Sequence, residues 1–413
     1  KNHYLRRSFL DKKISFNQNL INMKRFYIYI SLFILFLISC NNSEEITQNA
    51  SEQIITNKDI KISNPQKWIN SKPLKINQLL GENKIVLIDF WTYTCVNCLR
   101  TLPFLKKWNE KYKSKGLVII GVHTPEFEFE KKKKNIEDFV DTLNLSYPIV
   151  IDNDYEIWDD FENRYWPAKY LFDKSGEIIY QHFGEGDYIE TEMAIRKALT
   201  TINQDISSIP IGEINNQEYS VKTTKGFFSD KSGINESNKG SEKPYFRMTR
   251  ELYMGYERNF SSRGMYSGQE EYYEDINQTV NYLDEQDYKH NKFYLNGLWR
   301  NGEESIIHER NTGSLEDYIA LKFLAKSVNV VSDSNNKEYI AYVKLNDKFL
   351  SKDSAGKNIE FDDSGRSFFR VNEPKMYSLI ILPESGEHTL KIYSKQKDFS
   401  LFAFTFGNYK DGF

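Results

Sequence analysis

The chain has three cysteines, and their placement constrains its fold and chemistry more than any other sequence feature. Cys95 and Cys98 are separated by two residues, and Cys40 lies far upstream. Exported domains that depend on disulfides for stability carry several cysteine pairs, which this sequence lacks. A bridge between Cys95 and Cys98 closes a very short loop and adds little by constraining the unfolded chain. Thiol–disulfide exchange therefore explains the pair better than a structural disulfide does.

The residues around this pair predict a strand followed by a helix. An apolar run spans 84–91, and leucines recur at helical spacing after Cys95. The N-terminus of a helix favours a thiolate through its unpaired N–H groups and its macrodipole. We predict that Cys95 attacks a substrate disulfide and that Cys98, one turn later, resolves the mixed disulfide. Zinc binding is the weaker explanation, because the sequence has no second Cys or His pair at ligand spacing.

Alternating strand and helix patterns in residues 65–203 indicate an α/β domain with a mixed sheet covered by helices. After the first strand and helix, we expect strands at 117–122, 147–152, 170–172 and 178–183, and helices at 129–143, 154–161 and 190–199.

The remainder of the chain has a different character. Residues 204–243 are polar and rich in Ser, Asn, Lys and Gly, which predicts a linker. Residues 244–413 carry short apolar runs separated by turn signals, such as Glu384-Ser385-Gly386, and predict an all-β jelly roll or sandwich. The expected strands are 293–299, 319–325, 328–331, 339–345, 377–382, 389–393 and 401–406.

The N-terminal residues read as an export signal. Met23 is followed by two basic residues, a short apolar run and Ser39-Cys40, so residues 23–39 predict a signal peptide. The end of this segment resembles the bacterial lipobox, which implies lipidation of Cys40. Residues 1–22 are then upstream translation, and residues 40–64 form a polar tether. The alternative is an uncleaved membrane anchor, and both interpretations place the rest of the chain outside the cytoplasm.

Net charge argues against nucleic-acid binding. The formal charge of the whole chain is −3, and residues 1–39 contribute +6, which leaves −9 from residue 40 onward. An acidic exported chain repels the phosphate backbone.

The motif around the cysteines resembles thioredoxin. Asp89 stands six residues before Cys95, Pro103 stands five residues after Cys98, and Pro167 occupies the place of the family's cis-proline. The run from Trp91 to Pro103, together with Tyr165-Trp166-Pro167-Ala168, resembles the extracytoplasmic DipZ/TlpA type of thiol–disulfide oxidoreductase. In this type, a carbohydrate-binding-module-like jelly roll follows the thioredoxin domain.

The resemblance implies a function in the bacterial cell envelope, with the protein lipid-anchored to a membrane. The expected activity is reduction of disulfides in exported proteins, with cytochrome c maturation as a candidate process. The Cys95–Cys98 disulfide would be the redox group, with no metal and no other cofactor. DipZ-type proteins carry an electron-carrying membrane domain, whose place we expect a separate CcdA-like membrane protein to take as electron donor.

Four further residues are candidates for supporting roles. Asp89, inside an apolar strand, is expected to shuttle the Cys98 proton, although a surface ion pair is the alternative. Glu126 either tunes Cys98 or is a solvated loop carboxylate. Trp166 either packs beside the disulfide or belongs to the core, and the backbone before Pro167 is expected to hold the substrate. His123 is expected to be structural rather than a base.

Two other functions fit parts of the sequence. The first is peroxide reduction: Thr92 gives a T-x-x-C pattern, but peroxiredoxins require a proline four residues before that Thr, where this chain has Ile88. The second is an envelope glycan- or protein-binding lipoprotein in which the thioredoxin domain is a scaffold. Aromatic residues make up 15% of the chain and can stack on sugars. A glycan is therefore a candidate ligand of the β domain, and no binding site for it is predicted.

Overall fold

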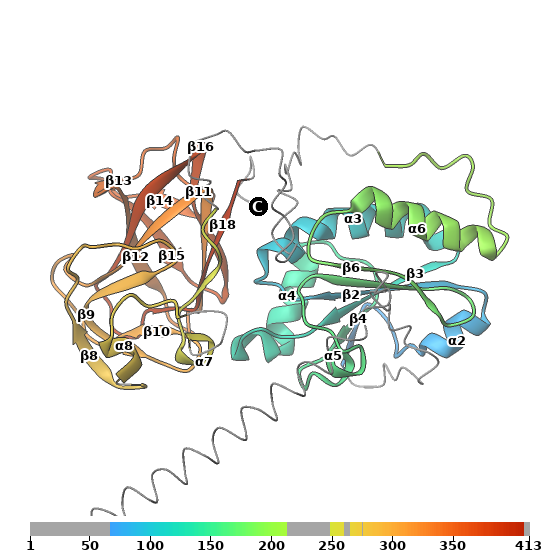
Figure 1. Ribbon diagram of the computed structural model, residues 1–413, viewed down its shortest axis with the longest axis horizontal. Coiled ribbons are helices and arrows are strands. Elements are labelled where there is room, and N and C mark those ends of the chain that lie inside the picture. Colours follow the sequence, from blue (N-terminus) through green and yellow to red (C-terminus); the bar gives the residue numbers. More distant parts are fainter. Residues whose placement is uncertain (1–66, 213–247, 260–264, 275, 409–413) are drawn as a thin grey trace, which may run out of the picture. The chain divides into compact units, whose positions relative to one another are not determined.

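The computed structural model describes residues 67–212, 248–259, 265–274 and 276–408, which belong to one compact unit. The predicted upstream segment, signal peptide, lipidated Cys40 and tether lie outside the described residues, as does most of the predicted linker. The described part consists of an α/β domain followed by a β domain (Figure 1).

The α/β domain is built on one six-stranded sheet with the order β1-β4-β3-β2-β5-β6. Strands β2, β3 and β4 are parallel, and the pairs β1–β4, β2–β5 and β5–β6 are antiparallel. The bounds are β1 Trp68–Ile69, β2 Ile85–Trp91, β3 Leu117–His123, β4 Ile149–Ile151, β5 Ala168–Phe172 and β6 Ile178–Phe183. This mixed sheet confirms the predicted thioredoxin fold.

Helices cover both faces of this sheet, as the alternation of side chains along β2 requires. Leu87 and Trp91 share a core with α3, α4 and α6, whereas Ile88 and Phe90 share a second core with α2 and α5. Figure 1 shows α3 and α6 on one side of the sheet and α2 and α5 on the other. The bounds are α2 Ile76–Gly81, α3 Val96–Tyr112, α4 Lys133–Thr142, α5 Glu156–Asp160 and α6 Tyr188–Thr201, with the 3-10 turns η1 Lys113–Lys115 and η2 Glu128–Lys131.

The helix expected over 129–143 is wrong at its start. The chain forms η2, becomes extended at Lys132 and only then begins α4. The cause is Glu130, whose buried carboxylate accepts hydrogen bonds from the backbone N–H groups of Thr94, Glu126 and Phe127. These tertiary bonds hold the segment in a tight turn that the apolar periodicity of the sequence does not reveal.

The β domain is an open antiparallel sheet. Its main order is β14-β15-β12-β16-β11-β9-β10-β17, and every pairing between its named strands in the described residues is antiparallel. The all-β prediction is therefore confirmed, while the finer description as a jelly roll stays a prediction. The bounds are β7 Leu252–Tyr253, α7 Tyr256–Asn259, α8 Glu271–Glu274, β8 Thr279–Tyr282, β9 Phe293–Asn301, β10 Ile306–His308, β11 Tyr318–Ser332, β12 Tyr339–Leu345, β13 Lys348–Phe349, β14 Ile359–Phe361, β15 Ser367–Val371, β16 Lys375–Ser394, β17 Ser400–Leu401 and β18 Ala403–Gly407.

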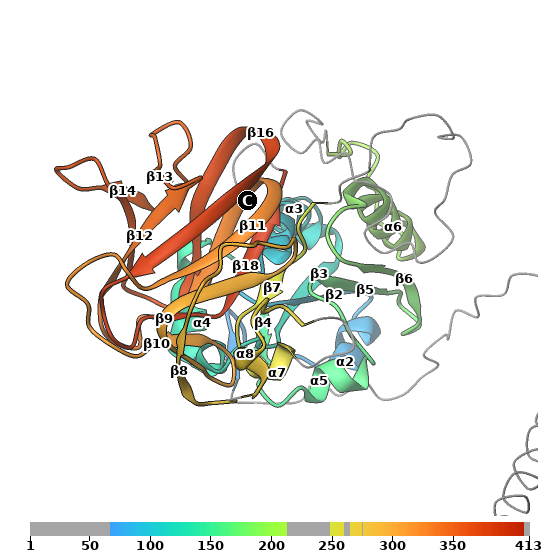
Figure 2. The ribbon, with the colours of Figure 1, turned by 60° about the vertical axis from the view of Figure 1, so that its left-hand side comes forward.

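Two long strands correct the sequence prediction. The runs expected as separate strands at 319–325 and 328–331 form the single strand β11, and those at 377–382 and 389–393 form β16. Residues 384–386 do not make a hairpin turn, because β16 pairs with β11 on both sides of them. The residues between Ile381 and Gly386 instead bulge opposite Lys326. Figure 2 shows β11 beside β16 and β18, with which it pairs.

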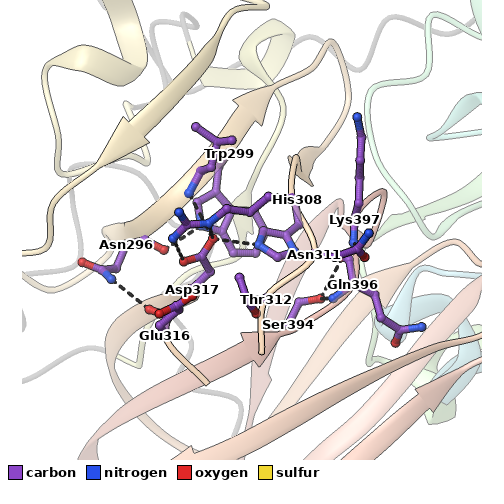
Figure 3. A network of polar contacts seen from close by, with 12 residues as sticks. Asn296, Trp299, His308, Asn311, Thr312, Glu316, Asp317, Ser394, Gln396 and Lys397 are labelled. Atoms are coloured by element: carbon purple, nitrogen blue, oxygen red, sulfur yellow. Dashed lines mark hydrogen bonds and ion pairs between the residues drawn. The ribbon is translucent and has the colours of Figure 1, made fainter. Parts of the chain in front are cut away.

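A buried carboxylate lies at the centre of a polar network in the β domain (Figure 3). Asp317 is fully buried and accepts hydrogen bonds from His308 Nε2 at 2.8 Å and from Arg310 Nε at 2.7 Å. The other ring nitrogen of His308 lies 2.8 Å from the Gln396 carbonyl oxygen. Burial raises the pKa of Asp317, but the bonds from Arg310 and His308 outweigh it and lower that pKa below its ordinary value. A Cβ at position 297, where φ is +96°, would strike this carboxylate, which explains Gly297.

We predict that Asp317→Asn destabilises the β domain by roughly 3 kcal/mol at neutral pH, because it leaves buried donors without their charged partner. The lowered pKa means that the Asp317 contribution is complete above the ordinary Asp pKa and disappears as the pH falls through the folded-state value. Urea unfolding at neutral and acidic pH measures both effects. Asp363→Asn, at an exposed position, is the control. Equal stability of Asp317→Asn and wild type at neutral pH would contradict the prediction.

Candidate active site

The two cysteines meet at the start of α3, directly after the central strand β2. Cys95 is the N-cap residue of α3, and its Sγ accepts a hydrogen bond from the Cys98 N–H at 3.2 Å. The Sγ atoms are 2.6 Å apart, and both residues are free cysteines. Cys95 is partly exposed, whereas Cys98 is buried. One cysteine is therefore partly accessible and the thiol of its neighbour stands within reach behind it, which is the arrangement that dithiol exchange requires.

The electrostatic surroundings of the two thiols are less favourable to ionisation than the helix N-terminus alone suggests. Burial raises the pKa of Cys95 well above its ordinary value, Cys98 and Glu126 raise it further, and the Cys98 N–H lowers it. Burial also raises the pKa of Cys98, to which Asp89 and Glu126 add. Ionisation of Cys95 therefore depends on how the charge of the neighbouring carboxylates is offset.

Asp89 lies on β2 beneath the cysteines and is buried, as its place in an apolar strand predicted. It shares the face of the sheet that α3 covers, because its side chain follows Leu87 in the alternation along β2. Burial raises its pKa to about 7, against the opposing charge of Lys169. Both carboxylate oxygens are without a hydrogen-bonding partner in the described part of the chain.

Lys169 is a site residue that the sequence reasoning missed. It lies on β5, directly opposite Asp89 in the antiparallel register, and is fully buried. Burial lowers its pKa, and the charges of Asp89 and Cys98 act against this. The sequence did carry a signal for it. Side chains alternate along β5, with Lys169 and Leu171 on one face and Ala168 and Tyr170 on the other, and helices cover both faces of the sheet. A lysine inside this strand therefore had to be buried.

Tyr147 borders the same buried space. Its hydroxyl has no partner among the described residues, and burial together with the charges of Asp89 and Cys98 raises its pKa well above the ordinary value. A Cβ at Gly121 would lie 3.2 Å from its ring and 3.0 Å from Trp91 Nε1. Gly121 is opposite Asp89 on β3, so its missing side chain leaves room for these groups.

Glu126 follows β3 and acts on both sulfurs, since its charge raises the pKa of Cys95 and of Cys98. Its side chain is 9% exposed, which rules out the alternative of a solvated loop carboxylate. Glu130, four residues later, was not predicted as a site residue. It accepts the Thr94 hydroxyl hydrogen at 2.6 Å and the Glu126 N–H at 2.5 Å, and so ties the residue before Cys95 to the Glu126 loop.

The peptide bond between Trp166 and Pro167 is cis, as the resemblance to thioredoxin implied. The Trp166 indole donates to the Thr124 carbonyl oxygen at 3.1 Å and lies 4.2 Å from the Trp158 ring, centroid to centroid. Trp166 and Cys95 are both partly buried at the edge of the same apolar cluster. His123 is fully buried between aromatic rings, and burial lowers its pKa to about 3, so it is neutral and serves packing.

The described residues contain no group of three or more His, Cys, Asp or Glu side chains that could hold a metal ion. Among the same residues, every helix is too short or too polar to span a bilayer. A shallow cavity of about 400 Å³ lies on the β domain and is lined by polar side chains, including Lys322, Asn346 and Glu387. It lies apart from the residues around the sulfurs.

Comparison with known proteins gives two family matches. Residues 58–181 match the AhpC/TSA family, and residues 249–407 match a thioredoxin like C-terminal domain. The latter gives no support to the expected carbohydrate-binding module, which remains a prediction.

Individual relatives resemble the α/β domain. Protein DipZ of Mycobacterium bovis is 47% identical over 135 residues, which is 32% of this chain and 19% of DipZ. The thiol-disulfide oxidoreductase YkuV of Bacillus subtilis is 34% identical over 119 residues, 29% of this chain and 77% of YkuV. A solution structure of a thioredoxin-like protein in the oxidized form is 28% identical and covers 34% of this chain and 93% of that chain, with a TM-score of 0.32.

The raised pKa of Asp89 predicts a specific pH dependence of stability. The folded-state pKa of about 7 exceeds the ordinary value of 3.8. Below pH 3.8 the buried Asp89 therefore lowers the stability of the protein by nothing, and between pH 3.8 and about pH 7 the loss of stability grows with pH. At 1.36 kcal/mol per pH unit, the cost above neutral pH is about 4 kcal/mol. Asp89→Asn should therefore unfold at higher urea concentration than wild type above neutral pH, and Asp141→Asn, at an exposed position, should not.

The role of Lys169 follows from the same titration. Lys169→Met removes the charge that lowers the pKa of Asp89, so the midpoint of the stability loss should move to higher pH. Urea unfolding of the reduced protein across the pH range measures this midpoint. A midpoint that is the same in Lys169→Met and wild type would show that the two buried groups do not interact.

Proposed function

Since the chain belongs to the thioredoxin-like thiol–disulfide oxidoreductases, we propose that it reduces disulfide bonds of exported proteins through Cys95 and Cys98. The observation that carries this proposal is the contact between the Sγ of Cys95, a partly exposed residue at the N-cap of α3, and the Sγ of the buried Cys98 behind it. This arrangement supports attack from the solvent side and resolution from within the protein.

The reaction proceeds in two exchanges. The Cys95 thiolate attacks one sulfur of the substrate disulfide, forms a mixed disulfide and expels the other substrate sulfur as a thiolate, which takes a proton from water. The Cys98 thiolate then attacks Cys95 Sγ and expels the second substrate sulfur. The substrate gains two electrons and two protons, and the protein is left with a Cys95–Cys98 disulfide. No metal or organic cofactor takes part in these steps.

The proton of Cys98 needs an acceptor inside the protein. Asp89 lies under Cys98 with a pKa raised to about 7 by burial, so near neutral pH it exchanges a proton readily. Lys169 stabilises the carboxylate form. Asp89 thus takes the Cys98 proton before the second exchange and returns it when the disulfide is reduced again. Glu126 tunes both sulfurs through its charge.

The substrate chain is proposed to lie against Trp166 and Pro167. This assignment rests on the resemblance to thioredoxin, in which the backbone before the corresponding proline pairs with an extended substrate. Trp166, held by its bond to the Thr124 carbonyl oxygen, forms one border of the approach to Cys95.

The setting of the reaction is proposed from the N-terminal sequence. The signal-like residues 23–39 and the lipobox-like Cys40 support a lipid-anchored protein on the outer side of a membrane in the bacterial cell envelope. A CcdA-like membrane protein would then return electrons to the oxidised pair. Cytochrome c maturation is the process that we propose for this reductase.

Reduction of insulin disulfides tests the activity. The wild-type chain with a chemical reductant should accelerate insulin precipitation, and Cys95→Ser should not, because the attacking sulfur is absent. Cys98→Ser retains the attacking sulfur but cannot release the bound substrate. This variant should therefore accumulate mixed disulfides, whose partners mass spectrometry identifies. Persistence of catalysis in a folded Cys95→Ser variant would refute the proposal. The rival function, glycan or protein binding by the β domain, predicts that Cys95→Ser and Cys98→Ser leave the cellular phenotype unchanged.

A further inference from the structure

Glu126 presents an electrostatic difficulty for the redox site. The Glu130 carboxylate bonds both Thr94, the residue before Cys95, and the Glu126 N–H, so the Glu126 loop is held against the redox pair. The charge of Glu126 raises the pKa of Cys95, the residue that must ionise, and that of Cys98. The side chain is too little exposed for water to screen this charge fully. A nearby cation is therefore needed if Glu126 is to stand beside the two sulfurs without suppressing the thiolate.

That cation comes from the β domain. Arg258, on α7, donates from Nη1 to Glu126 Oε1 at 2.8 Å and from Nη2 to the Glu126 carbonyl oxygen at 3.1 Å. Tyr253, on β7, donates its hydroxyl to Glu126 Oε1 at 2.8 Å. The guanidinium group also lies over the Tyr253 ring, 4.6 Å from its centroid. Arg258 therefore binds both the side chain and the backbone of Glu126. These bonds fix the position of Glu126 and offset its negative charge.

A second carboxylate joins this group. Glu251 Oε2 lies 3.1 Å from the Tyr253 hydroxyl oxygen, whose single hydrogen points to the nearer Glu126 Oε1. Burial and the charge of Glu126 raise the pKa of Glu251 to about 7, and Arg258 and Arg100 act in the opposite direction. Arg100 lies on α3, two residues after Cys98. The charged groups next to the redox pair thus form one cluster, to which both domains contribute.

Apolar contacts hold the two domains together at this place. The Phe402 ring meets Phe127 at 5.3 Å and Phe129 at 4.9 Å, centroid to centroid and both edge to face. Phe402 and Met376 belong to the same buried cluster as Cys98 and Leu102.

A polar contact lies beside these rings. Both oxygens of Glu304 accept the Glu128 N–H, each at 3.0 Å. Because the bond engages the backbone of the Glu126 loop, it restrains the loop itself and not only one side chain.

We infer that residues 251–258 of the β domain are part of the redox site, with Arg258 and Tyr253 as positioning residues that hold Glu126 and offset its charge beside Cys95. The inference rests on the proposed function and extends it by assigning the β domain a task in the chemistry. Arg258 and Tyr253 touch neither substrate nor sulfur in this assignment; they act through Glu126.

The pH dependence of Cys95 alkylation tests the inference on the full chain. Reduced protein is treated with iodoacetamide at a series of pH values, and peptide mass spectrometry follows Cys95 alone. Arg258→Gln should move the alkylation midpoint to higher pH, with roughly fivefold slower alkylation below the midpoint, because an unpaired carboxylate disfavours the thiolate. Tyr253→Phe, which keeps the ring but loses one donor, should shift the midpoint in the same direction by a smaller amount.

A double-mutant cycle separates a positioning role from a general structural one. Glu126→Gln should lower the midpoint, and Arg258→Gln should have no further effect in the Glu126→Gln background. Arg366→Gln removes an equal charge elsewhere in the β domain and should leave the midpoint unchanged. Arg258→Lys, which keeps the charge but not the forked geometry, should fall between wild type and Arg258→Gln.

Two results would overturn the inference: an unshifted midpoint in folded Arg258→Gln or Tyr253→Phe, or an equal shift by Arg258→Gln with and without Glu126. Circular dichroism establishes which variants are folded. If Arg258→Gln does not fold, the result for Tyr253→Phe decides the test. Because alkylation reports Cys95 ionisation without turnover, a failure of insulin reduction leaves this test intact. Conversely, an active enzyme with no coupling between Arg258 and Glu126 would refute the inference alone.

Discussion

The contact between Cys95 and Cys98 depends on the end of one buried strand. β2 is central in its sheet, paired with β3 on one side and β5 on the other, and its last residues lead straight to the N-cap of α3. Both neighbours hold the strand in register, and the short turn that follows it is tied down at Thr94 by the Glu130 carboxylate, which fixes where Cys95 begins α3. The helix then places Cys98 one turn later.

The same burial that gives this precision makes ionisation costly. Desolvation raises the pKa of both thiols and of Asp89, and Glu126 adds a second negative charge nearby. A basic residue accompanies each acid: Lys169 stands opposite Asp89 in strand register without an ion pair between the two side chains, and Arg258 binds Glu126 from α7. Each basic residue favours the charged form of the acid that it accompanies. The balance between these pairs, more than the helix N-terminus alone, sets how readily Cys95 becomes a thiolate.

Sequence reasoning recovered the features that are local. The C-x-x-C pair, the strand before it and the buried position of Asp89 all follow from residue types within a few positions of one another. Lys169 was missed because its partner is 80 residues away in sequence and adjacent only through strand register. Glu130 fell inside a predicted helix, and only the fold brings Thr94 and Glu126 to it. The misread turn signal at 384–386 has the same origin, since pairing with β11 overrides it.

Arg258 and Tyr253 were also missed from sequence, because their partner Glu126 lies in the other domain. Their contacts change how the β domain is understood. A domain that only bound a glycan or tethered the enzyme would need no polar bonds to the loop beside the redox pair. Here it donates to Glu126 from two side chains, accepts the Glu128 N–H, and packs the Phe402 ring edge to face against Phe127 and Phe129. A partly buried ion pair such as Arg258–Glu126 adds little net stability, since desolvation offsets most of its Coulomb energy. Its retention next to a thiol that must ionise is better explained by control of that thiol's charge than by domain cohesion, for which the apolar contacts of Phe402 suffice.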